Sequence, residues 1–219
     1  MTEKHRLSRR ELLQIGGVVA IGYGVSVFVN ATAPLGIDVS TNRIAQGLLR
    51  DPGGPIEGPD DANLRVVVFT DYQCPACRRA APALDAAMRD DGGVQVAYKD
   101  WPIFGDVSEQ AARAALASEP QGLYFKVHHA LMRENRALTE PVLREIVERE
   151  RGDWARLAYD LQKRRERIQT ALARTATHAF ALGIAGTPAF LIGPLLVKGA
   201  LNRSEFAKAF SEARAKLHL

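Results

Sequence analysis

The sequence lacks several features that would define its class directly. Only two of its 219 residues are cysteines, and no second Cys-x-x-Cys pair is present to complete a zinc site of that type. Beyond residue 33 the chain carries 25 basic and 23 acidic residues, a balance of 25 − 23 = +2, without a dense basic stripe. This balance argues against nucleic acid as the main partner.

A long apolar run is also missing, because the N-terminal run Ile15–Val29 is short. As a helix its fifteen residues would span about 22 Å, whereas a hydrocarbon core is about 30 Å thick. The run follows a basic head, in which Ser8–Leu13 resembles the twin-arginine export motif. We therefore expect residues 1–33 to be an export signal, cleaved after Ala31, with the body in the periplasm or another extracytoplasmic space. An uncleaved membrane anchor is the alternative.

The two cysteines, Cys74 and Cys77, lie in a Cys-Pro-Ala-Cys motif between an apolar run and a helical pattern. The run 65–70 reads as a buried strand, and residues 78–89 read as a helix. The positive end of a helix favours the thiolate of a cysteine placed there, and the thiolate is the nucleophile in disulfide exchange. This placement predicts a dithiol that cycles with its disulfide.

Other interpretations of the two cysteines are weaker. A structural disulfide that closes so short a loop would contribute only about 2 kcal/mol. A zinc site would need further ligands, and His128 and His129 lack zinc-finger spacing from the motif. These histidines lie in a helical pattern, which favours packing over ligation. In the oxidising surroundings outside the cytoplasm, a single Cys-x-x-Cys motif is also more typical of a redox role than of metal binding.

The remaining sequence predicts an α/β protein. Its composition, with 47% hydrophobic and 25% charged residues, is that of a globular chain able to bury a core. Residues 34–60 are rich in proline, glycine and aspartate, and we interpret them as a leader or linker with one short helix near 43–49. Residues 61–219 then contain strands 65–70, 94–98, 189–192 and 195–197, helices 77–89 and 204–217, and a helical block at about 106–182. Without that block the order is β-α-β-β-β-α, which matches a thioredoxin-like fold with an inserted α-helical domain.

Three segments, 69–79, 99–102 and 182–190, resemble the DsbA-like thiol:disulfide interchange proteins of the thioredoxin superfamily. The resemblance implies that Cys74 is the exposed nucleophile and Cys77 the buried resolving cysteine. It also implies that Pro188 is cis and packs against the active-site disulfide. The backbone at Thr187 would then pair with an extended substrate segment.

The sequence departs from the family pattern at one buried position. Many relatives carry an acidic residue six positions before the nucleophile, where this chain has Val68. Proton relay to Cys77 would then need Lys99, Asp71 or water. For Lys99 a plain surface position is the alternative interpretation, and for Asp71 it is a cap on the turn.

The leading prediction for function is an exported thiol–disulfide oxidoreductase that oxidises cysteine pairs of exported proteins. The resemblance implies a membrane redox partner that re-oxidises the dithiol, and we expect no cofactor and no metal. A disulfide isomerase or reductase is the first alternative, because Thr187 before the proline occurs in relatives of that type. A non-catalytic, membrane-tethered module that holds a metal or a partner through its thiolates is the second.

Overall fold

The computed structural model describes residues 35–217, and its main compact unit begins at Gly36. The predicted export signal or membrane anchor, residues 1–33, lies outside the described residues. Among the helices between residues 35 and 217, none combines the length and the apolar character that crossing a bilayer requires.

Within the described residues the strands form one sheet of six, in the order β1-β6-β5-β3-β4-β2. The central strand, β3, runs parallel to β4 and antiparallel to β5, and the short strands β1 and β2 lie at the two edges. The strand bounds are β1 Ile37–Asp38, β2 Ile56–Glu57, β3 Leu64–Thr70, β4 Val94–Asp100, β5 Ala189–Ile192 and β6 Leu195–Lys198.

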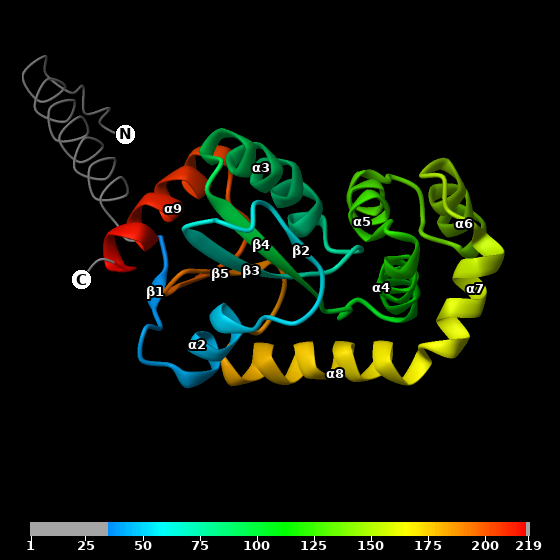
Figure 1. The fold of residues 1–219 in the computed structure, drawn as a ribbon, viewed down its shortest axis with the longest axis horizontal. Coiled ribbons are helices and arrows are strands. Elements are labelled where there is room, and N and C mark those ends of the chain that lie inside the picture. Colours follow the sequence, from blue (N-terminus) through cyan, green and yellow to red (C-terminus); the bar gives the residue numbers. More distant parts are fainter. Residues whose placement is uncertain (1–34, 218–219) are drawn as a thin grey trace, which may run out of the picture. The chain divides into compact units, whose positions relative to one another are not determined.

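Helices cover both faces of this sheet (Figure 1). The helix that follows β3 packs with the C-terminal helix on one face, while α2 and α8 lie on the other. The helix bounds are α2 Arg43–Arg50, α3 Pro75–Asp91, α4 Asp106–Ala117, η1 Glu119–Gln121, α5 Tyr124–Arg133, α6 Glu140–Arg149, α7 Trp154–Lys163, α8 Arg165–Ala181 and α9 Arg203–Leu217.

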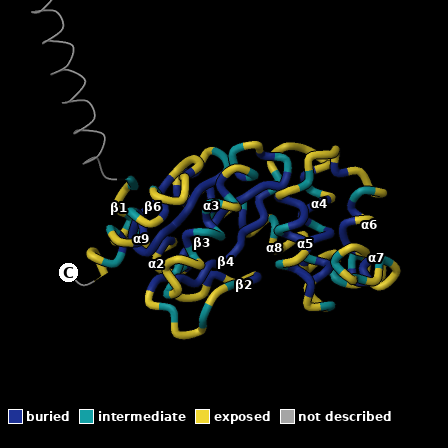
Figure 2. Tube along the Cα trace, turned by 90° about the horizontal axis from the view of Figure 1, so that it is seen from above, coloured by how far each residue is buried: buried dark blue, intermediate teal, exposed yellow. Residues whose placement is uncertain are grey.

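Burial on both faces explains why β3 and β4 read as nearly continuous apolar runs rather than as alternating ones. Every residue of β4 is buried, and Figure 2 shows β3 and β4 largely in the dark blue of buried residues. Val67 and Phe69 of β3 pack with Leu191 of β5 and with Ala179 of α8 in one hydrophobic core.

Helices α4 to α8 follow one another between β4 and β5, where the α-helical insertion is predicted at about 106–182. Helix α8 contacts β4 of the sheet as well as α4 and α7 of the insertion. This long helix therefore ties the inserted helices to the sheet, as its course along Figure 1 shows.

The structure differs from the sequence-based interpretation of residues 34–60 as a leader or linker. The expected short helix is present as α2, but the segment also supplies both edge strands: Ile37 pairs with Leu196, and Ile56 pairs with Ala97. Strands of two residues carry no readable periodicity, so only their tertiary partners define them.

Candidate active site

The dithiol lies where the central strand ends. The register places Phe69 opposite Ala189 and Thr70 opposite Asp100, so β3, β4 and β5 bring three loops to one end of the sheet. After Thr70 the chain makes one turn and enters α3, with Cys74 as its N-cap residue. Proline follows at the first helical position, where its missing N–H costs no hydrogen bond.

Backbone and side-chain bonds hold this turn. The Cys74 N–H donates to the Asp71 carbonyl at 3.2 Å, and the Gln73 N–H donates to Asp71 Oδ1 at 2.7 Å. Arg78, one residue after the motif, donates from Nε to the Tyr72 carbonyl at 2.7 Å and from Nη1 to the Glu134 carbonyl at 2.6 Å. The turn is thus fixed both to itself and to the loop after α5.

The two cysteines are free thiols in different surroundings. The Sγ of Cys74 accepts the Cys77 N–H at 3.3 Å, which is the capping bond at the start of α3. The same sulfur donates its thiol hydrogen to the Thr187 carbonyl at 3.2 Å. Burial raises the pKa of Cys77 to about 12, so Cys77 keeps its proton at neutral pH.

The predicted difference in exposure between the cysteines is absent. Cys77 is buried as expected, but Cys74 is also only 2% exposed, so the expectation of an exposed nucleophile is wrong for this reduced structure. The reason is the close approach of the Thr187 carbonyl, a contact across 113 positions of sequence. The two sulfurs therefore do not differ in exposure. They differ in their hydrogen bonds, because Cys74 Sγ caps the start of α3.

The loop opposite the dithiol contains the expected cis peptide bond, between Thr187 and Pro188. The Pro188 carbonyl accepts the Gly199 N–H at 2.9 Å, and Ala189 begins β5. The hydroxyl oxygen of Thr187 is buried without a hydrogen-bond partner among the described residues. The sheet thus places this loop directly against Cys74.

Asp71 connects the active-site turn to the loop after β4 through hydrogen bonds of its carboxylate. Its Oδ2 accepts the N–H groups of Ile103 at 2.6 Å and Phe104 at 3.2 Å, and its Oδ1 accepts the Ser108 hydroxyl as well as the turn. The bond to the Gln73 amide matches the alternative prediction that Asp71 caps the turn. The other bonds connect the turn to the segment between β4 and α4 and to the first turn of α4.

Lys99 is only 6% exposed, so the interpretation of this residue as a plain surface lysine is wrong. Its ammonium donates to the carbonyls of Pro52 and Gly53, and the latter bond is 2.6 Å long. Burial lowers the pKa of Lys99 to about 8. The residue therefore ties the segment before β2 to the sheet.

Sequence reasoning did not assign a role to Asp100, which follows Lys99 at the end of β4. Asp100 is 3% exposed, and its Oδ2 accepts the Tyr124 hydroxyl at 3.0 Å. Burial raises the pKa of Asp100 to about 7, because removal from water penalises the carboxylate. A carboxylate at the end of a fully buried strand was the signal in the sequence that could have identified it.

The adjacent histidines both have partners within the fold. Burial lowers the pKa of His128, whose Nδ1 shares a 2.9 Å hydrogen bond with the Tyr72 hydroxyl. His129 lies 3.3 Å from Glu57 and 3.4 Å from Asp85, which raises its pKa. Within residues 35–217, no group of three or more His, Cys, Asp or Glu side chains is placed to hold a metal ion.

A thioredoxin-like sheet with a dithiol at a helix start and a cis-proline loop against it defines the class of this protein, and known proteins agree. A sequence model of the family described as DSBA-like thioredoxin domain matches residues 65–211. A solved thioredoxin-like oxidoreductase from Silicibacter pomeroyi DSS-3 is 34% identical with a TM-score of 0.73, covering 80% of this chain and 98% of that one.

Two sequence relatives differ in how much of their length is matched. The probable disulfide bond formation protein D of Bacillus anthracis is 27% identical over 148 residues, which are 62% of this chain and 67% of that protein. The Na(+)/H(+) antiporter NhaA 1 of Salinispora arenicola is 28% identical over 167 residues, 75% of this chain. The chain spans only 25% of the length of that antiporter.

The chain belongs to the DSBA-like thioredoxin domain family, whose match spans more than half of its residues. Both the predicted family and the predicted thioredoxin-like fold are thereby confirmed.

Asp100 should make stability depend on pH. Its pKa is 3.8 without burial and about 7 in the folded protein, so the folded state binds this proton more tightly. The free energy of unfolding should therefore fall as the pH rises from about 4 to about 7. Asp100→Asn removes this contribution, and its stability relative to the wild type should rise by on the order of 2–4 kcal/mol across that range.

Urea unfolding at a series of pH values measures this difference. The exposed Asp61 provides a matched control, and Asp61→Asn should leave the relative stability unchanged over the same range. Parallel pH curves for Asp100→Asn and the wild type would contradict the prediction.

Proposed function

We propose that this protein is an exported thiol–disulfide oxidoreductase that oxidises cysteine pairs of other exported proteins through Cys74 and Cys77. The observation that carries the proposal is the position of Cys74 Sγ, which lies between the Cys77 amide in the first turn of α3 and the carbonyl before the cis-proline. Amides at a helix start stabilise a developing thiolate, and an adjacent backbone edge can align an extended chain beside the sulfur.

In the oxidised enzyme the two cysteines share a disulfide. A substrate thiolate attacks Cys74 Sγ, forming a mixed disulfide, while the Cys74–Cys77 bond breaks and Cys77 leaves as a thiolate that takes up a proton. A second substrate thiolate then attacks the substrate sulfur of the mixed disulfide, and Cys74 leaves. The substrate loses two electrons to form its disulfide, and the enzyme gains them as a dithiol.

The burial of Cys77 lengthens the life of the mixed disulfide. Because its pKa is about 12, Cys77 is rarely a thiolate at neutral pH and is slow to attack a mixed disulfide and return the substrate to its thiol form. The second thiol of the substrate then has time to complete the new disulfide. The dithiol that remains requires an oxidant, which we infer to be a membrane redox partner that accepts its two electrons.

Exposed apolar side chains beside the dithiol suit unfolded substrates. Ile103 and Phe104 are 40% and 52% exposed, and Asp71 binds the backbone amides of both next to the active-site turn. Phe180 at the end of α8 is 69% exposed and meets Trp101 edge to face at 5.6 Å. Apolar surface of this kind can bind hydrophobic segments that folded substrates hide.

Asp71 and Lys99 enter the proposal as positioning residues rather than as proton relays. Asp71 fixes the active-site turn relative to the loop that contains Ile103 and Phe104, and Lys99 fixes the segment before β2. Thr187 and Pro188 are proposed to line the substrate strand.

Isomerase or reductase activity is the second candidate, and Thr187 is the feature that favours it. The oxidase should re-form disulfides in a reduced, unfolded model protein several times faster than it corrects the scrambled form. Both rates can be measured as recovery of the model protein's activity. Faster recovery from the scrambled form would reverse the assignment.

Replacing the buried cysteine should trap the intermediate. In Cys77→Ala no internal thiol can release a substrate, so mixed disulfides through Cys74 should accumulate with exported proteins. Acid quenching, alkylation and non-reducing electrophoresis of cells that express the full chain would reveal them as reductant-sensitive adducts. The matched Cys74→Ala variant should give none, and an absence of adducts in Cys77→Ala would count against the function.

The exposed apolar residues Ile103 and Phe104 should raise the rate of oxidation of unfolded proteins but not that of small thiols. Phe104→Ser should lower kcat/KM for oxidation of an unfolded protein by about fivefold to tenfold, the effect of losing one buried aromatic contact. The rate with dithiothreitol should not change. Leu217→Ser is a matched control, because Leu217 is 51% exposed at the other end of the sheet, near Gly193. Equal losses on both substrates would place the effect in the dithiol instead.

A further inference from the structure

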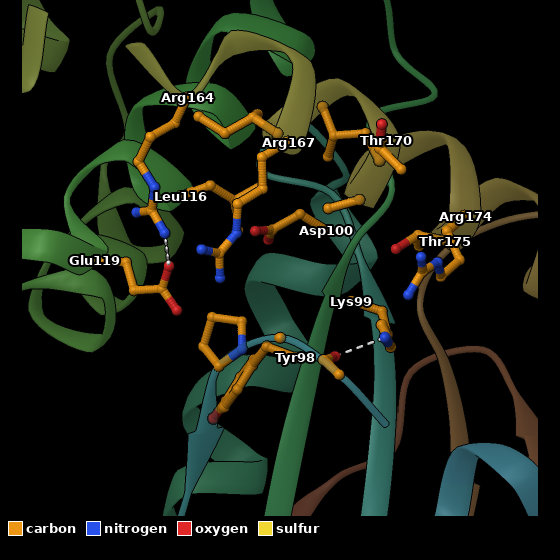
Figure 3. Close-up of a pocket in the computed structure, with 16 residues that line it drawn as sticks. Tyr98, Lys99, Asp100, Leu116, Glu119, Arg164, Arg167, Thr170, Arg174 and Thr175 are labelled. Atoms are coloured by element: carbon orange, nitrogen blue, oxygen red, sulfur yellow. Dashed lines mark hydrogen bonds and ion pairs between the residues drawn. The ribbon is translucent and has the colours of Figure 1, made fainter. Parts of the chain in front are cut away.

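A second concave site lies beside the end of β4, and it does not contain the dithiol. It is a pocket of about 520 Å³ between the last residues of β4, the loop at residues 53–55, and helices α4 and α8 (Figure 3). This volume is typical of small-molecule sites. None of Cys74, Cys77, Thr187 and Pro188 lines it, so binding there is separable from disulfide exchange.

The pocket is rich in positive charge. Four cationic side chains line it, Lys99, Arg164, Arg167 and Arg174, against the carboxylates of Asp100 and Glu119. The local balance is 4 − 2 = +2. Among residues 35–217, Glu119 pairs with Arg164 at 2.9 Å, whereas Arg167 and Arg174 form no ion pair. An anion is the ligand that this arrangement attracts.

Two buried polar atoms in the pocket lack partners among the described residues. One is Nη1 of Arg164, the nitrogen that does not face Glu119. The other is Oδ1 of Asp100, on a side chain that is 97% buried and whose carboxyl group points into the pocket in Figure 3. A buried donor or acceptor left without a partner is costly, so each indicates a group that a ligand would supply.

Together these atoms specify the ligand. The guanidinium groups of Arg164 and Arg167 call for a carboxylate or phosphate group, and the free oxygen of Asp100 calls for a hydrogen-bond donor beside it. Apolar side chains of Pro55, Leu116 and Ile168 complete the lining and suit a short carbon skeleton.

We propose that this pocket binds a small organic anion whose carboxylate or phosphate group lies between Arg164 and Arg167 and whose neighbouring hydroxyl, amide or ammonium group donates to Asp100.

Titration calorimetry of the full chain at low ionic strength tests this site with malate, succinate and inorganic phosphate as probes. Malate carries a hydroxyl beside a carboxylate, and succinate differs only in lacking it. Malate should bind with one site per chain and about fivefold more tightly than succinate, the effect of one hydrogen bond. Saturable binding of phosphate with the same variant response supports the anionic half of the site.

Arg167→Ala should weaken malate binding by about tenfold or more, because it removes a charge-assisted contact. Arg165→Ala removes the same charge from the same helix, but Arg165 is exposed and does not line the pocket, so binding should not change. Circular dichroism establishes that each variant is folded, and Arg174→Ala provides a second test by the same criterion. Failure of all three probes to bind, equal losses in Arg165→Ala and Arg167→Ala, or equal affinity for malate and succinate overturns the proposal.

Discussion

The register of the central strand is the constraint on which the rest of this molecule depends. Strand β3 is held between a parallel neighbour and an antiparallel one, with Thr70 opposite Asp100 and Phe69 opposite Ala189. Both faces of β3 are buried, so a shift by one residue would exchange its two sets of core side chains, and packing fixes the register strongly. Three loops distant in sequence therefore meet at one end of the sheet.

Several ionisable groups lie at this end of the sheet, and burial makes the charged form of each less favourable. The pKa values of Cys77 and Asp100 rise and that of Lys99 falls, and desolvation is the largest cause in each case. The groups at this end of the sheet differ in their hydrogen-bond partners. Cys74 lies against an amide at the helix start, Lys99 is bound by two carbonyls, and Asp100 keeps one oxygen without a partner.

Strand β4 connects the two sites of the molecule. Its end approaches the active-site turn through the pairing with Thr70, and the same three last residues, Tyr98 to Asp100, form a wall of the basic pocket. The insertion makes both possible, because α5 supplies Tyr124 to Asp100, α8 supplies Arg167 and Arg174, and the junction of α7 and α8 supplies Arg164. The insertion thus builds surfaces that a bare thioredoxin-like sheet would lack.

The sequence by itself determined the dithiol, the order of the elements and the inserted helical block, because strong local patterns define each of them. Strand β5 has the bounds that its apolar run predicted. Tertiary structure alone decided the burial of Cys74 and Lys99, the edge strands at Ile37 and Ile56, and the environment of Asp100. These depend on partners far along the chain, and local spacing carries no information about which carbonyl or side chain will close over a given residue.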